Sequence, residues 1–145
     1  MGNENFSEEE RRKSQRLRIN ITIVYRINKP SHVKVLIGDE EVEATTQDLS
    51  ESGMSILTGY DIPVSTMLTV EFMIYQVSEL ERFRFYKSIK IIGEVRSNIH
   101  SVNDLRRIGI VFTKIEEEDK LELAKFVQRR IESGNVEMFP DGSGE

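Results

Sequence analysis

The sequence contains no cysteine among its 145 residues. This absence excludes disulfide bonds, thiolate zinc sites and a cysteine nucleophile. No uninterrupted apolar run approaches the roughly 20 residues that a membrane-spanning helix needs, and residues 1–10 lack the apolar core of a signal peptide. We therefore expect a cytoplasmic protein with no membrane insertion.

Sequence motifs that carry catalysis are also missing. His32 and His100 have no partners at a spacing typical of a metal site or a catalytic triad. There is no phosphate-binding P-loop and no Gly-x-Gly-x-x-Gly motif. Carboxylates are plentiful, but they gather in the N-terminal stretch and at the start of an expected helix, where a solvated face explains them. The sequence therefore predicts a protein that is not an enzyme, with no catalytic residues, no metal site and no cofactor.

The composition is typical of a single globular domain. Hydrophobic residues make up 38% of the chain and charged residues 31%, and the formal net charge is −5. A negative net charge argues against a general nucleic-acid coat, so any anion site must be a local basic cluster. We expect a flexible arm at residues 1–10, one domain at residues 11–134 and a disordered tail at residues 135–145.

The central part of the chain alternates apolar and polar residues with a period of two, which predicts antiparallel strands. The expected strands are residues 19–27, 33–37, 41–47, 54–57, 67–75, 82–99 and 107–112. The second and third of these read as a hairpin across Gly38 and Asp39. Gly93 indicates a bulge or a bend within the longest strand.

The period changes to 3.6 after the last strand, which predicts one C-terminal helix. Four carboxylates, at residues 116–119, stand where the helix dipole favours negative charge. The expected apolar face consists of Leu121, Leu123, Ala124, Phe126, Val127 and Ile131. Gly134 is placed to end the helix. Six or seven strands followed by one helix predict a mainly β fold, a small barrel with the helix covering one opening or face.

A basic cluster precedes the first strand, with five basic side chains within residues 11–18. Arg12 and Arg16 are four residues apart, so they can share one side of a helical turn or fork around one ligand. The planar guanidinium group makes paired hydrogen bonds to phosphate or to the O6 and N7 atoms of guanine. The alternative reading is a solvated arm that binds anions non-specifically.

A second polar cluster, Asp48-Leu49-Ser50-Glu51-Ser52-Gly53, lies between two expected strands. Asp48 and Ser50 supply acceptors, which the N–H donor edge of guanine requires. Gly53 allows a tight reversal or a close approach of a flat ligand to the backbone. Taken alone, the segment also reads as an ordinary hairpin turn. Together the two clusters could bind a guanine nucleotide with few phosphates.

The two motifs, RxxxR at residues 12–16 and DxSxxG at residues 48–53, occur in this order and resemble the PilZ domain of bacteria. The similarity continues through residues 93–95 and 107–112 and covers about residues 11–132. This resemblance implies a six-stranded antiparallel β-barrel that binds cyclic di-GMP, a bacterial second messenger.

In this resemblance the ligand-binding residues are Arg11, Arg12, Arg16, Asp48, Ser50 and Gly53. Arg11 precedes RxxxR as in members that take two stacked ligand molecules. The implied function is a receptor or adaptor whose arginine arm becomes ordered on binding and which signals through an unknown effector protein. The alternatives are a small barrel that binds nucleic acid, with residues 11–18 following the phosphates, and a PilZ-like adaptor that binds no nucleotide. The net charge argues against the nucleic-acid alternative.

Overall fold

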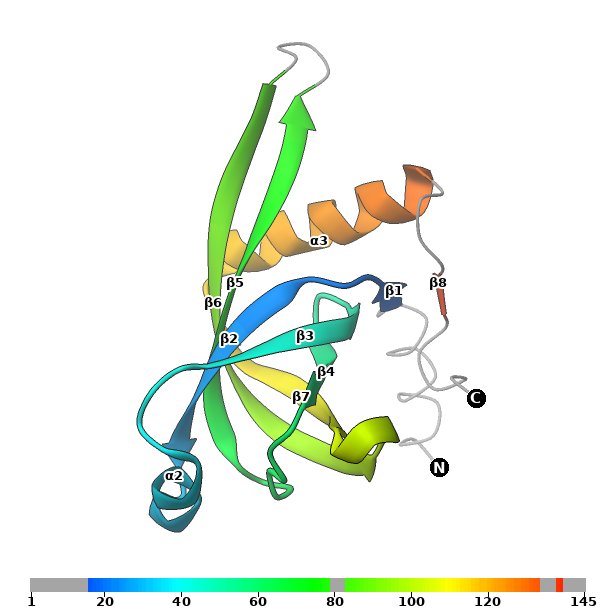
Figure 1. Cartoon of the computed structure of the whole chain (residues 1–145). Helices are drawn as coiled ribbons and strands as arrows, with labels where there is room; N and C mark the ends of the chain where they lie inside the picture. The colour runs from blue at the N-terminus through cyan, green and yellow to red at the C-terminus, as the bar shows by residue number, and fades with distance from the viewer. Residues whose placement is uncertain (1–15, 79–82, 134–137, 140–145) are drawn as a thin grey trace, which may run out of the picture.

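The computed structural model describes residues 16–78, 83–133 and 138–139 (Figure 1). In chain order the elements are β1 (Arg16–Arg18), β2 (Thr22–Lys29), α2 (Ser31–Ile37), β3 (Val42–Leu49), β4 (Gly53–Thr58), β5 (Met67–Ser78), β6 (Phe83–His100), the 3-10 helix η1 (Val102–Asp104), β7 (Arg106–Ile115), α3 (Glu117–Ser133) and β8 (Met138–Phe139). No helix in this described part of the chain is long and apolar enough to cross a membrane.

Six antiparallel strands form a closed barrel in the order β2-β5-β6-β7-β4-β3, and pairing between β2 and β3 completes the ring. The predicted six-stranded barrel is therefore confirmed. The predicted bulge at Gly93 is confirmed as well, since the pairing of β6 with β7 shifts register between Ile92 and Gly93. A Cβ atom on Gly93 would lie 2.5 Å from Cγ2 of Ile110, so only glycine fits at this close approach.

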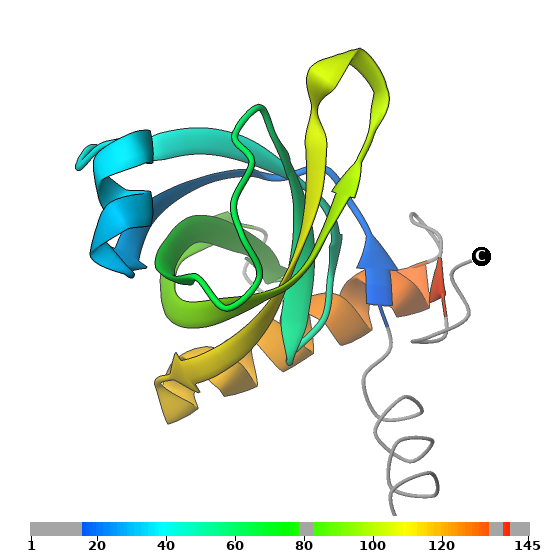
Figure 2. The same ribbon diagram turned by 90° about the horizontal axis from the view of Figure 1, so that it is seen from below.

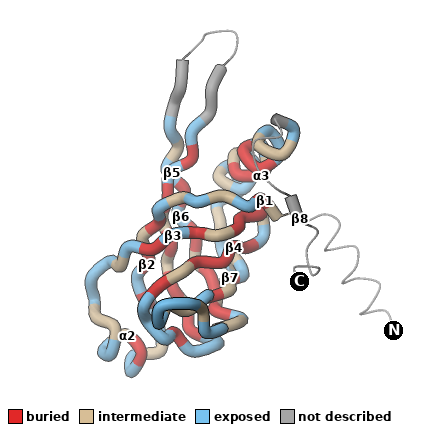
Figure 3. The backbone as a smooth tube through the Cα atoms, turned by 45° about the vertical axis from the view of Figure 1, so that its right-hand side comes forward, coloured by how far each residue is buried: buried red, intermediate tan, exposed pale blue. Residues whose placement is uncertain are grey.

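Buried positions alternate with less buried ones along much of the barrel strands (Figure 3), because alternate side chains point into the barrel interior. Fully buried members include Ile23, Tyr25, Ile56, Leu68 and Ile91. The Tyr25 hydroxyl is satisfied by a 2.8 Å hydrogen bond with Thr58 Oγ1. Burial raises the pKa of Tyr25 to about 12.

The segment after β2 differs from the prediction, because residues 31–37 form the helix α2 instead of a hairpin strand. Its β-branched residues favoured a strand in the sequence. In the structure Val33 is buried and Ile37 is partly buried, one helical turn apart, whereas Val35 and Leu36 are each 80% exposed. Gly38 ends the helix at a φ of 113°, and its N–H donates to the Lys34 carbonyl oxygen at 2.7 Å.

The C-terminal helix α3 packs its buried side against the barrel, and Figure 2 shows it crossing beneath the strands. Leu123, Phe126 and Val127 are buried, and Ile131 is partly buried. Leu121 was expected on this face, but it is 56% exposed. The reason is geometric: Leu123, Phe126 and Val127 are spaced by three and four residues, and a side chain two positions earlier points about 200° away from Leu123.

Both ends of the described chain meet at one place on the barrel (Figure 1). β1 pairs with β3 on one side and with β8 on the other. Residues 16–18 are therefore part of the sheet, although the sequence placed them in the basic cluster before the first strand. Met138 and Phe139 form β8, which differs at these two residues from the disordered tail expected at 135–145. The expected flexible arm at residues 1–10 lies outside the described residues.

Candidate functional site

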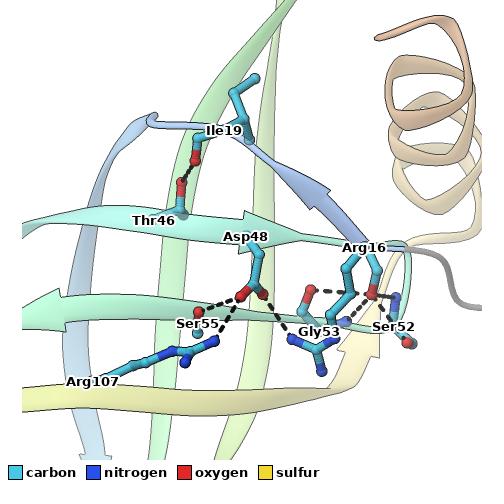
Figure 4. Close-up of polar contacts among 9 residues, drawn as sticks. Arg16, Ile19, Thr46, Asp48, Ser52, Gly53, Ser55 and Arg107 are labelled. Atoms are coloured by element: carbon cyan, nitrogen blue, oxygen red, sulfur yellow. Dashed lines mark hydrogen bonds and ion pairs between the residues drawn. The ribbon is translucent and has the colours of Figure 1, made fainter. Parts of the chain in front are cut away.

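The carboxylate of Asp48, near the end of β3, is the centre of a polar cluster on the barrel (Figure 4). Its Oδ1 accepts a hydrogen bond from Arg16 Nη1 at 2.7 Å. Its Oδ2 accepts from Ser55 Oγ at 2.8 Å and from Arg107 Nη2 at 3.1 Å. Asp48 is only 7% exposed. A carboxylate this deeply buried needs such partners, and the two arginines balance its charge.

Arg16 reaches Asp48 because β1 is held firmly along β3. Leu17, the next residue, is fully buried and lies opposite Leu49 in the strand pairing. The chain after β1 is fixed by the buried hydroxyl of Thr46, which accepts from the Ile21 N–H at 3.1 Å and lies 3.2 Å from the Ile19 carbonyl oxygen. A buried leucine and a buried threonine thus fix the strand that carries the arginine.

Ser55 and Arg107 reach the same carboxylate from the neighbouring strands β4 and β7. Ser55 lies opposite both Asp48 on β3 and Gly109 on β7. Arg107 is two residues before Gly109, so it is on the same face of β7. Figure 4 shows Arg16 and Arg107 approaching Asp48 from its two sides. The side chains of Arg16 and Arg107 are 31% and 49% exposed, so both guanidinium groups are accessible to a ligand.

The rest of the DxSxxG motif builds the turn that follows β3. Ser50 is buried, and its Oγ accepts from the backbone N–H groups of Ser52 and Gly53, each at 3.1 Å. Its own N–H donates to the Gly53 carbonyl oxygen at 2.9 Å. A Cβ atom on Gly53 would lie 2.6 Å from the Ile110 carbonyl oxygen. In the described structure, therefore, Ser50 closes a turn and Gly53 permits close contact between β4 and β7.

The structure brings Arg16 and Asp48 together and places Ser50 and Gly53 in the turn beyond them. The other two residues expected in the site, Arg11 and Arg12, lie outside the described residues.

Sequence reasoning missed Ser55 and Arg107. The alternation of β7 contained a signal for Arg107, since Ile108 and Ile110 point inward and the residues that alternate with them, Arg107 and Gly109, must lie on the outward face. The pairing of β3 with β4 and of β4 with β7, which brings both residues to Asp48, could not be read from one strand.

The cluster combines one carboxylate with two guanidinium groups, so Arg16, Arg107 and Asp48 together carry one net positive charge. The exposed guanidinium groups can donate to an anion or to an acceptor edge, and the carboxylate can accept from N–H groups. Within the described residues, no group of three or more His, Asp or Glu side chains could hold a metal ion.

The sequence matches the PilZ domain family over residues 10–129. The chain therefore belongs to the PilZ domain family. No curated protein matches the chain.

Solved structures of bacterial proteins share its fold. The inhibitor of motility MotI/DgrA of Bacillus subtilis superposes with a TM-score of 0.65 at 14% sequence identity, covering 85% of this chain and 52% of that one. The MrkH–c-di-GMP complex of K. pneumonia superposes with a TM-score of 0.56 at 13% identity, covering 84% of this chain and 53% of that one. The chain thus spans about half the length of these two proteins.

Proposed function

We propose that this chain is a receptor that binds cyclic di-GMP on the barrel surface around Asp48. The observation that carries the proposal is the placement of Arg16 and Arg107 on two sides of one carboxylate. Guanine has an acceptor edge, O6 and N7, and a donor edge at N1 and N2. The ligand also carries two phosphates. A surface that offers guanidinium donors beside a carboxylate acceptor matches these three features.

Each residue then has a specific role. Arg16 and Arg107 donate to phosphate or to the guanine acceptor edge, or stack on the purine plane. Asp48 accepts from the guanine donor edge. From the resemblance to the family, Arg12 acts with Arg16 on guanine and phosphate, Arg11 favours a second, stacked ligand molecule, and Ser50 accepts from the guanine edge. Gly53 acts indirectly, since it allows β4 and β7 to approach closely behind the site.

Membership of the PilZ family supports this ligand, and one solved neighbour is a complex with c-di-GMP. The domains of this family are typically receptors and not enzymes. Signalling through a partner protein is also part of the proposal. Binding would act on that partner by rearranging the segment that carries the arginines.

The ligand has to compete with bonds that already exist. Both Asp48 oxygens accept hydrogen bonds from arginines in the structure. Binding therefore exchanges partners: the guanine edge replaces an arginine at the carboxylate, and the released guanidinium turns to the phosphate. We propose that this exchange draws the segment before β1, with Arg11 and Arg12, across the ligand. The proposal applies to residues before 16, since β1 itself is already paired with β3.

Calorimetric titration of the purified chain with cyclic di-GMP tests the proposal. We expect binding that falls by at least about tenfold in Arg16→Ala, because a charge-assisted hydrogen bond contributes about 1.5–3 kcal/mol. Arg106→Ala is the matched control, since the Arg106 side chain is exposed to a similar extent as that of Arg16, but its guanidinium lies 3.7 Å from Asp61 and not at Asp48. No heat of binding in the unmodified chain, or equal losses in both variants, would reject the site.

A salt series separates this proposal from nucleic-acid binding. A protein that follows a phosphate backbone loses affinity steeply as salt rises. A ligand with two phosphates, bound also through base edges and stacking, should give a shallow slope. Tight RNA binding with a steep slope, and no response to cyclic di-GMP, would instead support the nucleic-acid alternative.

A further inference from the structure

The β5–β6 hairpin extends well beyond the barrel as a two-stranded ribbon (Figure 1). Pairing of β2 with β5 ends at Phe72, and pairing of β7 with β6 ends at Ile91. Beyond these points β5 and β6 pair only with each other among the described strands, as far as Ser78 and Phe83. Residues 73–78 of β5 and 83–90 of β6 therefore present two outer edges with no described strand beside them.

Helix α3 holds the ribbon in place. Lys87 Nζ lies 3.4 Å from Asp119 Oδ1 in the first turn of α3. The Arg130 guanidinium donates to the Tyr75 hydroxyl and lies 4.8 Å from the centre of the Tyr75 ring. Tyr75 also packs edge-on against the Phe126 ring, with 6.4 Å between the ring centres. A strand edge held in this way can bind a partner without a large further loss of conformational freedom.

The two outer edges differ in charge. Residues 83–90 of β6 include Arg84, Lys87 and Lys90, whereas residues 73–78 of β5, Met-Ile-Tyr-Gln-Val-Ser, contain no charge, no proline and no glycine. Basic residues protect a strand edge against pairing, and a long uncharged edge lacks this protection. Met73 on the uncharged edge is 55% exposed.

We propose that residues 73–78 of β5 pair with the same residues of a second copy of this chain. The pairing would be antiparallel about a two-fold axis and would form a four-stranded sheet in the order β6-β5-β5-β6. In a symmetric pairing each residue of this uncharged segment lies opposite another residue of the same segment in the second copy. No two charged side chains therefore face each other within the paired segment. Three of the six residues direct their N–H and C=O groups outward, which gives about six backbone hydrogen bonds between the copies.

The uncharged β5 edge suits pairing with a second copy better than the β6 edge does. Self-pairing through the β6 edge would bring three basic residues of each copy together, which is unfavourable. Glu71 precedes the uncharged segment and Glu79 follows it in the sequence, so charges limit the paired length to this segment. The pairing is independent of the Asp48 site and does not require cyclic di-GMP.

Sedimentation equilibrium of the whole chain, from low micromolar to submillimolar concentration and with and without cyclic di-GMP, tests the inference. We expect a monomer–dimer equilibrium in both conditions. Met73→Lys should raise the dissociation constant by about tenfold or more, because a lysine on a strand edge opposes the addition of another strand. Ser88→Lys is the matched control: Ser88 is exposed and lies directly opposite Met73 on β6, one strand away from the edge.

The outcomes are distinct. Loss of the dimer in Met73→Lys with an unchanged dimer in Ser88→Lys supports pairing through the β5 edge. Equal loss in both variants, or no loss in Met73→Lys, would overturn it in favour of another interface. A chain that stays monomeric throughout would overturn self-pairing and leave a strand of a different protein as the occupant. Thermal unfolding of both variants shows whether the barrel is unchanged, as expected for two exposed positions.

Discussion

Replacing Asp48 by asparagine should destabilise the protein even when no ligand is present. The substitution keeps the shape of the side chain but removes its charge, so Arg16 and Arg107 are left facing each other without the carboxylate between them. Stability can be measured by urea unfolding followed by circular dichroism, which suits a chain without tryptophan. A site residue that served only the ligand would give no such effect.

The size of the effect follows from the distances. At 2.7 Å and 3.1 Å, Coulomb's law gives about 1.5 and 1.3 kcal/mol in water, and about four times as much at an effective dielectric constant near 20. The arginine side chains are 31% and 49% exposed, so the lower values are the better guide. Removing a buried charge also recovers part of its desolvation cost. We therefore expect a loss of about 2 kcal/mol, which lowers the Tm by roughly 4–8 °C.

A double-mutant cycle isolates the electrostatic part. Arg107→Ala should lower the free energy of unfolding by about 1 kcal/mol in the unmodified chain. In the Asp48→Asn background it should lower it by nothing, because removing Arg107 there relieves its repulsion with Arg16. The coupling should weaken in high salt. Arg106→Ala, whose partners are Asp61 and Asn98, should cost the same in both backgrounds. If Asp48→Asn changes stability by less than about 0.5 kcal/mol, or Arg107→Ala costs the same in both backgrounds, the electrostatic account is refuted.

Three further predictions concern the barrel and its helix. The pKa of Tyr25 is raised to about 12 from an ordinary value of 10.0, so the folded state keeps the hydroxyl proton to a higher pH than the unfolded state does. The free energy of unfolding should therefore be unaffected below pH 10 and fall by up to about 2.7 kcal/mol as the pH rises to 12. Urea unfolding across this pH range should show that Tyr25→Phe removes this loss. Gly53→Ala should cost about 1–3 kcal/mol in urea unfolding, because its Cβ would meet a backbone oxygen that cannot move aside; an unchanged midpoint would contradict this. Phe126→Ala should cost about 3–5 kcal/mol by the same assay, whereas the exposed Leu121→Ala should cost under about 0.5 kcal/mol.

The sequence was sufficient for the parts of the fold that depend on local periodicity. The long strand with a bulge at Gly93 and the acidic start of α3 were both predicted and are both present. The hairpin expected at residues 33–47 was wrong. The β-branched residues of this segment favoured a strand, and the only sign of a helix in the sequence was the spacing of Val33 and Ile37 by one helical turn. Over seven residues, strand and helix patterns overlap, and packing against the barrel decides between them.

The candidate site was predictable where a motif lies within one segment, and unpredictable where strands converge. Arg16 and Asp48 each lie in a short motif, and the complementary chemistry of the two motifs predicted that these residues act together. The structure places Arg16 Nη1 2.7 Å from Asp48 Oδ1. Arg107 is 59 residues from Asp48 along the chain, and only the pairing of β3, β4 and β7 brings them together. For Gly53 the sequence suggested a tight reversal or room for a flat ligand. In the described structure its missing side chain makes room for the backbone of β7.

The arrangement around Asp48 explains how a buried charge can be kept ready for a ligand. A buried carboxylate without partners would cost more free energy than a small barrel can spare. Here two arginines and one hydroxyl donate hydrogen bonds to it. The side chains of both arginines are partly exposed, so water can solvate a guanidinium group that moves away from the carboxylate. In the proposed function, the affinity for a guanine nucleotide is the difference between two sets of hydrogen bonds. Weakening the Arg107–Asp48 pair should therefore lower the cost of exchanging partners while removing one donor for the ligand, and the two effects oppose each other.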